Sequence, residues 1–249
     1  MREISLLRQL VNHDQFVKLL DILEDDQGTT KNIHCIFEFC EKVLANELNK
    51  RACALPKEQT RKLIKDLLIA VDVLHGKMIM HRDIKPDNIL IDKAGRLKLA
   101  DFGLAKKASF LQRRKSNAIV SLWYRAPEII LGSEDYFLGV DMWSVGCIFA
   151  ELMSERPIFM CKSENEVLGR VFKLLGTPSD KFCSVYQTLP KWKQGSWGNY
   201  APPGCIKHAF PAASVQAMDL LQKMLCLDPQ KRILAKEALN HPYFTSPSS

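Results

Sequence analysis

Residues 79–103 of this 249-residue chain read IMHRDIKPDNILIDKAGRLKLADFG, and this stretch decides the fold. Two short runs rich in apolar residues, 88–91 and 96–99, flank Asp92-Lys-Ala-Gly95. Asp suits the first position of a type I turn and Gly the last, so the two runs are predicted to pair as a hairpin. Folding the chain back in this way brings the loop before the hairpin beside the loop after it.

These two loops carry side chains that suit phosphoryl transfer. That reaction needs a carboxylate to orient the attacking hydroxyl, oxygen ligands for Mg²⁺ and a cation near the moving phosphate. The loops supply such groups as Asp83, Lys85, Asn88 and Asp101. Each acid taken alone is better explained as the cap of a turn, but the four together at this spacing favour the catalytic interpretation.

Three motifs of the chain resemble those of the protein-kinase family. His81–Asn88, Asp101–Gly103 and Ala126–Glu128 match the H-R-D-x-K-x-x-N, D-F-G and A-P-E motifs, in that order. The resemblance covers essentially the whole chain. It implies an α+β fold, protein-kinase-like, with an incomplete small lobe and a mainly helical large lobe.

The resemblance also assigns roles to the loop residues. It implies that Asp83 is the catalytic base, that Lys85 stabilises the transferring phosphate, and that Asn88 and Asp101 hold Mg²⁺. ATP is expected between the two lobes. The residues expected at the nucleotide are Glu3, Phe37, Glu38, Cys40, Lys85, Asn88, Leu90 and Asp101. Val43 departs from the family pattern, which usually has an aspartate near the ribose.

Apolar periodicity and β-forming runs predict the other elements. The spacing predicts helices at 1–10, 56–76, 141–153, 164–175 and 214–226, strands at 16–23 and 33–39 around a turn at 24–32, and a loop at 190–211. The division expected from the resemblance is a small-lobe remnant at 1–40 (a cyclin-binding helix and two strands), a large lobe at 41–244 and a disordered tail at 245–249.

Several segments resemble the cyclin-dependent branch of the family in particular. They are Arg2–Leu7, similar to the end of the cyclin-binding helix, Phe37–Phe39, similar to the hinge, Leu122–Glu128, and Leu175–Pro178. This resemblance implies a cyclin partner and protein substrates with Ser-Pro or Thr-Pro sites, with Arg125 shaping the pocket for the proline. Different segments point to kinase-activating, cell-cycle and transcription-linked members, so the subfamily stays open.

Regulation by phosphorylation follows from the same resemblance. Ser116 falls at the family's activating phosphorylation site, counted back from Ala126-Pro-Glu128. The cations expected to pair with that phosphate are Arg2, Arg82 and Lys106, the last in place of the usual arginine.

Two further contacts are expected from the family. Glu128 and Arg232 fit its buried ion pair, which ties the activation segment to the large lobe, and removing either partner should leave an unpaired buried charge. Asp141 resembles the aspartate that braces the catalytic loop from below.

Composition narrows the alternatives. The formal charge of +7 comes from basic residues interspersed with acids, so a solvated surface explains it better than direct nucleic-acid binding. No apolar run reaches the length of a membrane span and no secretion signal opens the chain, so the nucleus or the cytoplasm is expected. The eight cysteines show no metal-binding spacing and are interpreted as reduced thiols.

The glycine-rich loop and strand lysine that grip ATP in kinases are not among these 249 residues. The expectation is a chain truncated at its N-terminus: an incomplete gene product, a true short isoform, or a protein that works without the loop. A rival hypothesis is a catalytically impaired kinase that binds a cyclin, a substrate or a scaffold.

Overall fold

Two helices, α3 (Lys57–Gly76) and α5 (Gly139–Leu152), form the centre of the chain. The structure is a computed structural model, and it describes residues 2–26, 31–51, 53–107, 122–134, 138–154, 156–179, 181–193, 195–202 and 206–245. Helix α3 is amphipathic and buries its apolar face, whereas every residue of α5 is buried. A helix that is apolar on all sides belongs inside a core, as the sequence predicted for this segment.

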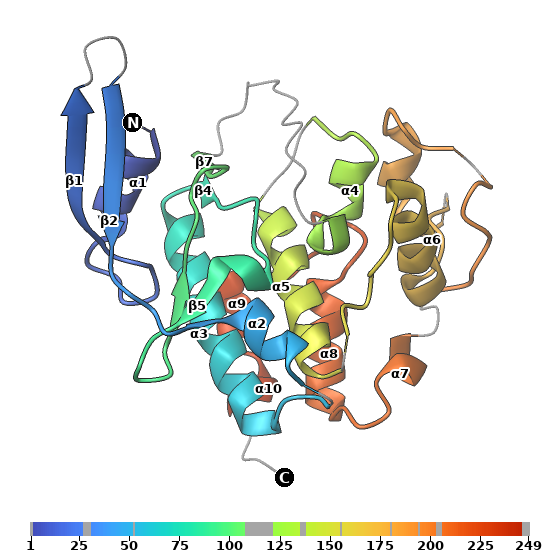
Figure 1. Ribbon diagram of the computed structural model, residues 1–249. Coiled ribbons are helices and arrows are strands. Elements are labelled where there is room, and N and C mark those ends of the chain that lie inside the picture. The colour runs from blue at the N-terminus through green and yellow to red at the C-terminus, as the bar shows by residue number, and fades with distance from the viewer. Residues whose placement is uncertain are drawn as a thin grey trace.

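Shorter helices surround this pair. In chain order they are α1 Arg2–Leu10, α2 Leu44–Asn49, α4 Pro127–Ile130, α6 Glu164–Leu175, α7 Ile206–Ala209, α8 Val215–Met224, α9 Ala235–Leu239 and α10 Pro242–Thr245. Within the described residues, three 3₁₀ helices accompany them: η1 Pro86–Asn88, η2 Leu122–Tyr124 and η3 Ser184–Thr188. Helices α8, α9 and α10 pack along α3 and α5 (Figure 1). None of the helices in the described part is long and apolar enough to cross a bilayer.

The described strands form three small antiparallel sheets. They are β1 Leu19–Asp26 with β2 Lys31–Phe37, then β3 Lys42–Val43, β5 Ile89–Ile91 and β6 Leu97–Leu99, and finally β4 Ile79–Met80 with β7 Lys106–Lys107. The hairpin predicted from residues 88–99 is β5 and β6. Its turn is closed by the backbone N–H of Gly95, which donates to the carbonyl of Asp92 over 2.9 Å.

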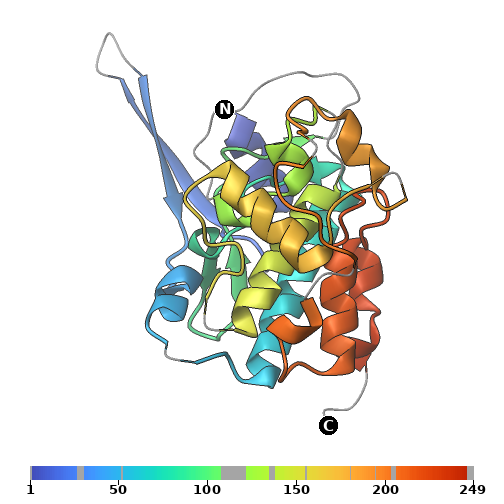
Figure 2. The same cartoon turned by 90° about the vertical axis from the view of Figure 1, so that its right-hand side faces the viewer.

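The β1–β2 hairpin extends away from the rest of the molecule, with α1 at its base (Figures 1 and 2). We call residues 41–245 the helical body. The hairpin joins the body at its root, where Phe16 pairs with Leu99 and the N–H of Val17 donates to the carbonyl of Leu99 over 3.1 Å. The beginning of the predicted first strand is therefore part of the body's core.

The observed boundaries correct four expectations. The first strand begins later than predicted, at Leu19, and the second begins earlier, at Lys31, so both extend into the predicted turn. Exposed side chains such as Glu24 and Asp25 allow this, because they can point into water on a solvated strand. The expected loop at 190–211 contains α7, and Thr245 belongs to α10 instead of the tail. The predicted helix at 141–153 begins two residues earlier, at Gly139.

The cysteine expectation holds for the residues that the structure covers. Seven cysteines are free thiols, namely Cys35, Cys40, Cys53, Cys147, Cys161, Cys183 and Cys226. Cys205 lies outside the described residues.

Candidate active site

The side chain of Asp83 lies in a buried loop directly before η1. Its Oδ2 accepts hydrogen bonds from Lys85 Nζ (2.8 Å) and Asn88 Nδ2 (3.0 Å). Its Oδ1 is buried and has no hydrogen-bond partner within the described part of the chain. A buried carboxylate oxygen without a partner is costly, so this atom is a candidate for contact with a ligand.

A second carboxylate, on Asp141 of α5, holds the loop from below. Its Oδ2 accepts the backbone N–H of His81 (2.9 Å) and His75 Nε2 (3.0 Å), and its Oδ1 accepts the backbone N–H of Arg82 (2.8 Å). Burial alone would raise the pKa of Asp141, but the hydrogen bond from His75 and the neighbouring donors outweigh it and lower that pKa. The brace expected from the sequence has this geometry, and it fixes the backbone of Arg82 at a left-handed φ of 70°.

His81 links this loop to the loop after the hairpin. Its Nδ1 accepts the N–H of Asp83 (3.3 Å), so its Nε2 carries the proton and donates to the carbonyl of Ala100 (3.0 Å). Burial lowers the pKa of His81, which favours this neutral form. The backbone N–H of Ala100 in turn donates to the carbonyl of Asn88 (2.9 Å), and Asp101 follows directly.

Asp101 is exposed, with a left-handed φ of 61°. Its Oδ1 accepts the N–H of Gly103 (3.1 Å), a local contact that suits aspartate in this conformation. The next residue, Phe102, is buried against the rings of His81 and Phe16, with centroids 5.1 and 5.8 Å apart. This packing anchors the segment and leaves the Asp101 carboxylate facing water.

The side chains of Asn88 and Asp101 could together bind one hard cation, provided that other molecules complete its coordination shell. Asn88 donates with its amide nitrogen, so its amide oxygen is available, and Asp101 adds a carboxylate. No group of three or more His, Cys, Asp or Glu side chains that could hold a metal occurs in the described ranges. Mg²⁺ commonly takes one or two protein oxygens and completes its shell with phosphate and water, which matches this pair.

Four of the residues expected at the nucleotide, Phe37, Glu38, Cys40 and Leu90, differ from one another in exposure and in contacts. Phe37 ends β2 and is partly exposed, Cys40 is half-buried, and Leu90 pairs with Val43 in the sheet. The carboxylate of Glu38 is engaged through its Oε1, which lies 3.1 Å from Lys98 Nζ and accepts the backbone N–H of Lys18 (2.8 Å).

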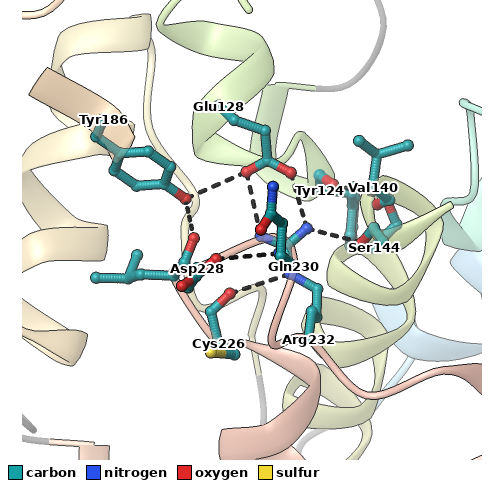
Figure 3. A network of polar contacts seen from close by, with 11 residues as sticks. Tyr124, Glu128, Val140, Ser144, Tyr186, Cys226, Asp228, Gln230 and Arg232 are labelled. Carbon is teal, nitrogen blue, oxygen red and sulfur yellow. Dashed lines mark hydrogen bonds and ion pairs between the residues drawn. The ribbon is translucent and has the colours of Figure 1, made fainter. Parts of the chain in front are cut away.

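Glu128 and Arg232 form the expected ion pair. Arg232 Nη1 and Nη2 lie 2.8 and 3.1 Å from the two oxygens of Glu128, and Nη1 also donates to the carbonyl of Gly139 over 2.7 Å. Figure 3 shows a third member, Tyr186, whose hydroxyl lies 3.2 Å from Glu128 Oε2 and donates to the carbonyl of Leu227 over 2.6 Å. Sequence reasoning missed Tyr186, because nothing in the stretch around it indicates a buried polar contact.

Three consecutive residues of the segment before α4 each have a different partner. Trp123 Nε1 donates to the carbonyl of Cys161 (2.8 Å), the Tyr124 hydroxyl donates to Glu151 Oε2 (2.6 Å), and Arg125 Nη1 lies 3.1 Å from Glu164 Oε1. The Tyr124–Glu151 contact is a second one that the sequence did not indicate. Burial raises the pKa of Glu151 to about 7.

The predicted phosphorylation site is only partly covered. Ser116 lies outside the described residues, and so do the side chains of Arg2 and Glu3 in α1. Lys106 lies on β7 opposite Met80, which precedes the loop of Arg82 by two residues. The pairing of β4 with β7 therefore brings two of the three expected cations into neighbouring segments.

Comparison with known proteins identifies a family and a similar protein. The family model described as "Protein kinase domain" matches residues 1–244. The protein named Cyclin-dependent kinase B2-1 of Arabidopsis thaliana is 39% identical over 253 residues, which cover 98% of this chain and 79% of that protein.

Proposed function

This chain belongs to the protein kinase family as a serine/threonine kinase of the cyclin-dependent type, and from this premise we propose that it phosphorylates serine or threonine followed by proline. The phosphate comes from the γ-position of ATP. One observation carries the proposal: Oδ1 of Asp83 is buried and has no partner among the described residues, while Lys85 and Asn88 hold its Oδ2. A substrate hydroxyl fits as its missing hydrogen-bond donor.

Asp83 acts as the base. Its Oδ1 accepts the hydrogen bond of the substrate hydroxyl and orients that oxygen toward the γ-phosphorus, and the proton passes to the carboxylate as the new P–O bond forms. The bond between the γ-phosphorus and the bridging oxygen of ATP breaks, and ADP leaves with that oxygen. Asn88 and Lys85 hold the other oxygen of Asp83, so the carboxylate does not rotate away.

Charge at the transferring phosphate is balanced by the same loop. Lys85 Nζ lies within reach of Asp83 and contributes a positive charge at the side where the phosphate arrives. Asn88 and Asp101 would hold Mg²⁺, which neutralises phosphate charge when bound. The backbone hydrogen bond between Ala100 and Asn88 keeps these two ligands in neighbouring segments.

The nucleotide is proposed to lie between the hinge and β5. Phe37, Cys40 and Leu90 would contact the base, and Glu38 would contribute through its backbone, because its carboxylate is engaged with Lys98 and Lys18. Glu3 is proposed to lie at the nucleotide, as in the sequence expectation.

The substrate's proline is proposed to sit beside Arg125. The fixed contacts of Trp123, Tyr124 and Arg125 support this, because a pocket for a rigid ring needs walls that do not move. Glu164 and Lys191, whose carboxylate and ammonium lie 3.0 Å apart, hold the Arg125 side of that wall.

A cyclin is the proposed partner, on α1, and Ser116 the proposed activating phosphorylation site. Its phosphate would pair with Arg2, Arg82 and Lys106. If this is correct, Ser116→Ala should lower cyclin-stimulated transfer, and unchanged stimulated transfer would remove this part of the proposal. The proposed location is the nucleus or the cytoplasm, as expected from the sequence.

Transfer of labelled γ-phosphate to two peptides that differ only as Ser-Pro and Ser-Ala tests the proposal. The Ser-Pro peptide should be preferred at least about tenfold, since an apolar contact that one substrate makes and the other lacks discriminates by about 1 to 3 kcal/mol. Asp83→Asn should reduce transfer by roughly 10²- to 10⁴-fold, while Asp72→Asn on α3 serves as a matched control. Equal transfer by wild-type and Asp83→Asn protein would contradict the catalytic role, and equal use of the two peptides would contradict the proline preference.

A further inference from the structure

Lys98 is an unusual residue in this molecule. It lies on β6 with a side chain that is 1% exposed, although lysine is almost never fully buried unless it is paired. Across the described ranges its ion-pair partner is Glu38, with Nζ and Oε1 3.1 Å apart. The phosphoryl-transfer mechanism does not use this lysine.

The pair closes a ring of contacts at the root of the β1–β2 hairpin. From Lys98 the chain passes to Leu99, whose carbonyl accepts the N–H of Val17 (3.1 Å). The next residue, Lys18, is bonded twice to Glu38, since its N–H donates to the Glu38 carboxylate (2.8 Å) and its carbonyl accepts the Glu38 N–H (2.9 Å). Lys98 Nζ then connects Glu38 back to β6.

The ring joins three segments that have separate places in the proposed site. Glu38 belongs to the hinge, Val17 and Lys18 lead into the hairpin, and Lys98 is three residues before Asp101 on the same strand and loop. Figures 1 and 2 show the hairpin projecting from the body, so contacts at its root determine how it is oriented. A buried ion pair is directional and resists small rotations that an apolar contact would allow.

We infer that Lys98 is a positioning residue that holds the Glu38 carboxylate and so sets the hinge backbone relative to Asp101. With its carboxylate held by Lys98 and Lys18, Glu38 offers its backbone to the proposed nucleotide. Loss of the Lys98 ammonium leaves the carboxylate held by the Lys18 N–H alone, without a link to β6, and the hairpin root then opens more often. The consequence for nucleotide binding rests on the proposed function, but the consequence for the root itself does not.

Site-resolved amide hydrogen exchange on the whole chain tests the ring directly. In Lys98→Met, the amides of Lys18 and Glu38 should exchange at least about tenfold faster, while amides of α3 and α5 keep their rates, because local opening is separate from global unfolding. The matched control is Lys223→Met, which removes an exposed lysine paired with Asp219 at 2.7 Å. Unchanged exchange at Lys18 and Glu38, or equal acceleration everywhere, would overturn the inference.

A second variant tests the same inference if Lys98→Met fails to fold. Lys98→Met leaves the Glu38 carboxylate without its cation, whereas Lys98→Met/Glu38→Gln removes both charges and keeps an acceptor for the Lys18 N–H. The double variant should still show faster exchange at the root than wild-type protein, because the link to β6 is gone. Wild-type rates at the root in the double variant would also overturn the inference.

The kinetic measurement separates positioning from simple destabilisation. In Lys98→Met, KM for ATP should rise by about tenfold with kcat within about twofold, whereas a smaller folded fraction would lower apparent kcat and leave KM unchanged. The second pattern would contradict the positioning role. If wild-type protein neither binds nor uses ATP, the proposed function fails. The hydrogen-exchange experiment would still show whether Lys98 holds the ring of contacts at the hairpin root together.

Discussion

The β1–β2 hairpin and the helical body are built in opposite ways. Leu20 in the hairpin is 63% exposed, and Leu23, Ile33, Ile36 and Phe37 are exposed to lesser degrees. The body buries large side chains such as Trp143 and Phe149 completely and pairs its buried charges, as in Glu128–Arg232. The helical body therefore carries most of the stability and the proposed catalytic groups, whereas the hairpin is held in place by the contacts at its root.

The largest expected effect is in the body. Arg232→Met should lower the free energy of unfolding by about 3 to 5 kcal/mol, because Glu128 would keep a buried charge without its partner. Urea denaturation measures this, with the neighbouring exposed Lys231→Met as a control that should change little. A small loss in Arg232→Met would contradict the view that the body depends on this network.

A truncation in the apolar core comes next. Leu67, on α3, is 1% exposed, and Leu67→Ala should cost about 3 kcal/mol through lost burial and the cavity left behind. The shift in the urea midpoint at constant slope gives the value. If Leu67→Ala were no more costly than a truncation in the hairpin, the proposed division of stability would be wrong.

The body also contains a carboxyl whose burial opposes stability at neutral pH. The pKa of Glu151 in the folded chain is about 7, above the ordinary value of 4.5, so the folded state binds the proton more tightly than the unfolded state. The stability from this group is therefore fully present below pH 4.5 and is lost as pH rises through about 7. The loss is about 3 kcal/mol, at 1.36 kcal/mol for each pKa unit.

Glu151→Gln removes this pH dependence, and its amide oxygen can still accept the Tyr124 hydroxyl. Relative to wild-type protein, the variant should gain about 2 to 3 kcal/mol of stability between pH 4.5 and pH 8. Unfolding curves at the two pH values give the comparison. If the difference in the free energy of unfolding between the two proteins stayed constant over this pH range, Glu151 would not be the source of the pH dependence.

The smallest effect is expected in the hairpin. Leu20→Ser should change the free energy of unfolding by about 0.5 kcal/mol or less, because the side chain already faces water. The same urea series measures it. A loss of about 2 kcal/mol or more would mean that this face is covered in solution, and the contrast between hairpin and body would then disappear.

Much of the body could be predicted from the sequence, since its signals are local. The β5–β6 hairpin follows from apolar runs around an Asp–Gly turn, and α3 from periodicity over 20 residues. The grouping of Asp83, Asn88 and Asp101 followed from that hairpin together with the family resemblance. In each case the residues that specify the structure lie close together in the chain.

The contacts that could not be predicted join residues that are distant in sequence. Tyr186 and Glu128 are 58 positions apart, and Tyr124 and Glu151 are 27 apart. A buried lysine on β6 reads in the sequence as the polar residue of an alternating strand, so nothing there indicates its pairing with Glu38. The β4–β7 pair was missed for another reason: each strand has two residues, too few for a pattern.

The central claim is that Asp83 and Asp101 have separate tasks within one braced site, and calorimetric titration with ATP and Mg²⁺ tests it most directly. Asp83→Asn should keep the wild-type affinity within about threefold while losing transfer by roughly 10²-fold or more, because this residue is proposed to touch the hydroxyl and not the nucleotide. Asp101→Asn should lose the Mg²⁺-dependent part of the affinity. Loss of nucleotide binding in Asp83→Asn, or undiminished Mg²⁺-dependent binding in Asp101→Asn, would contradict the account.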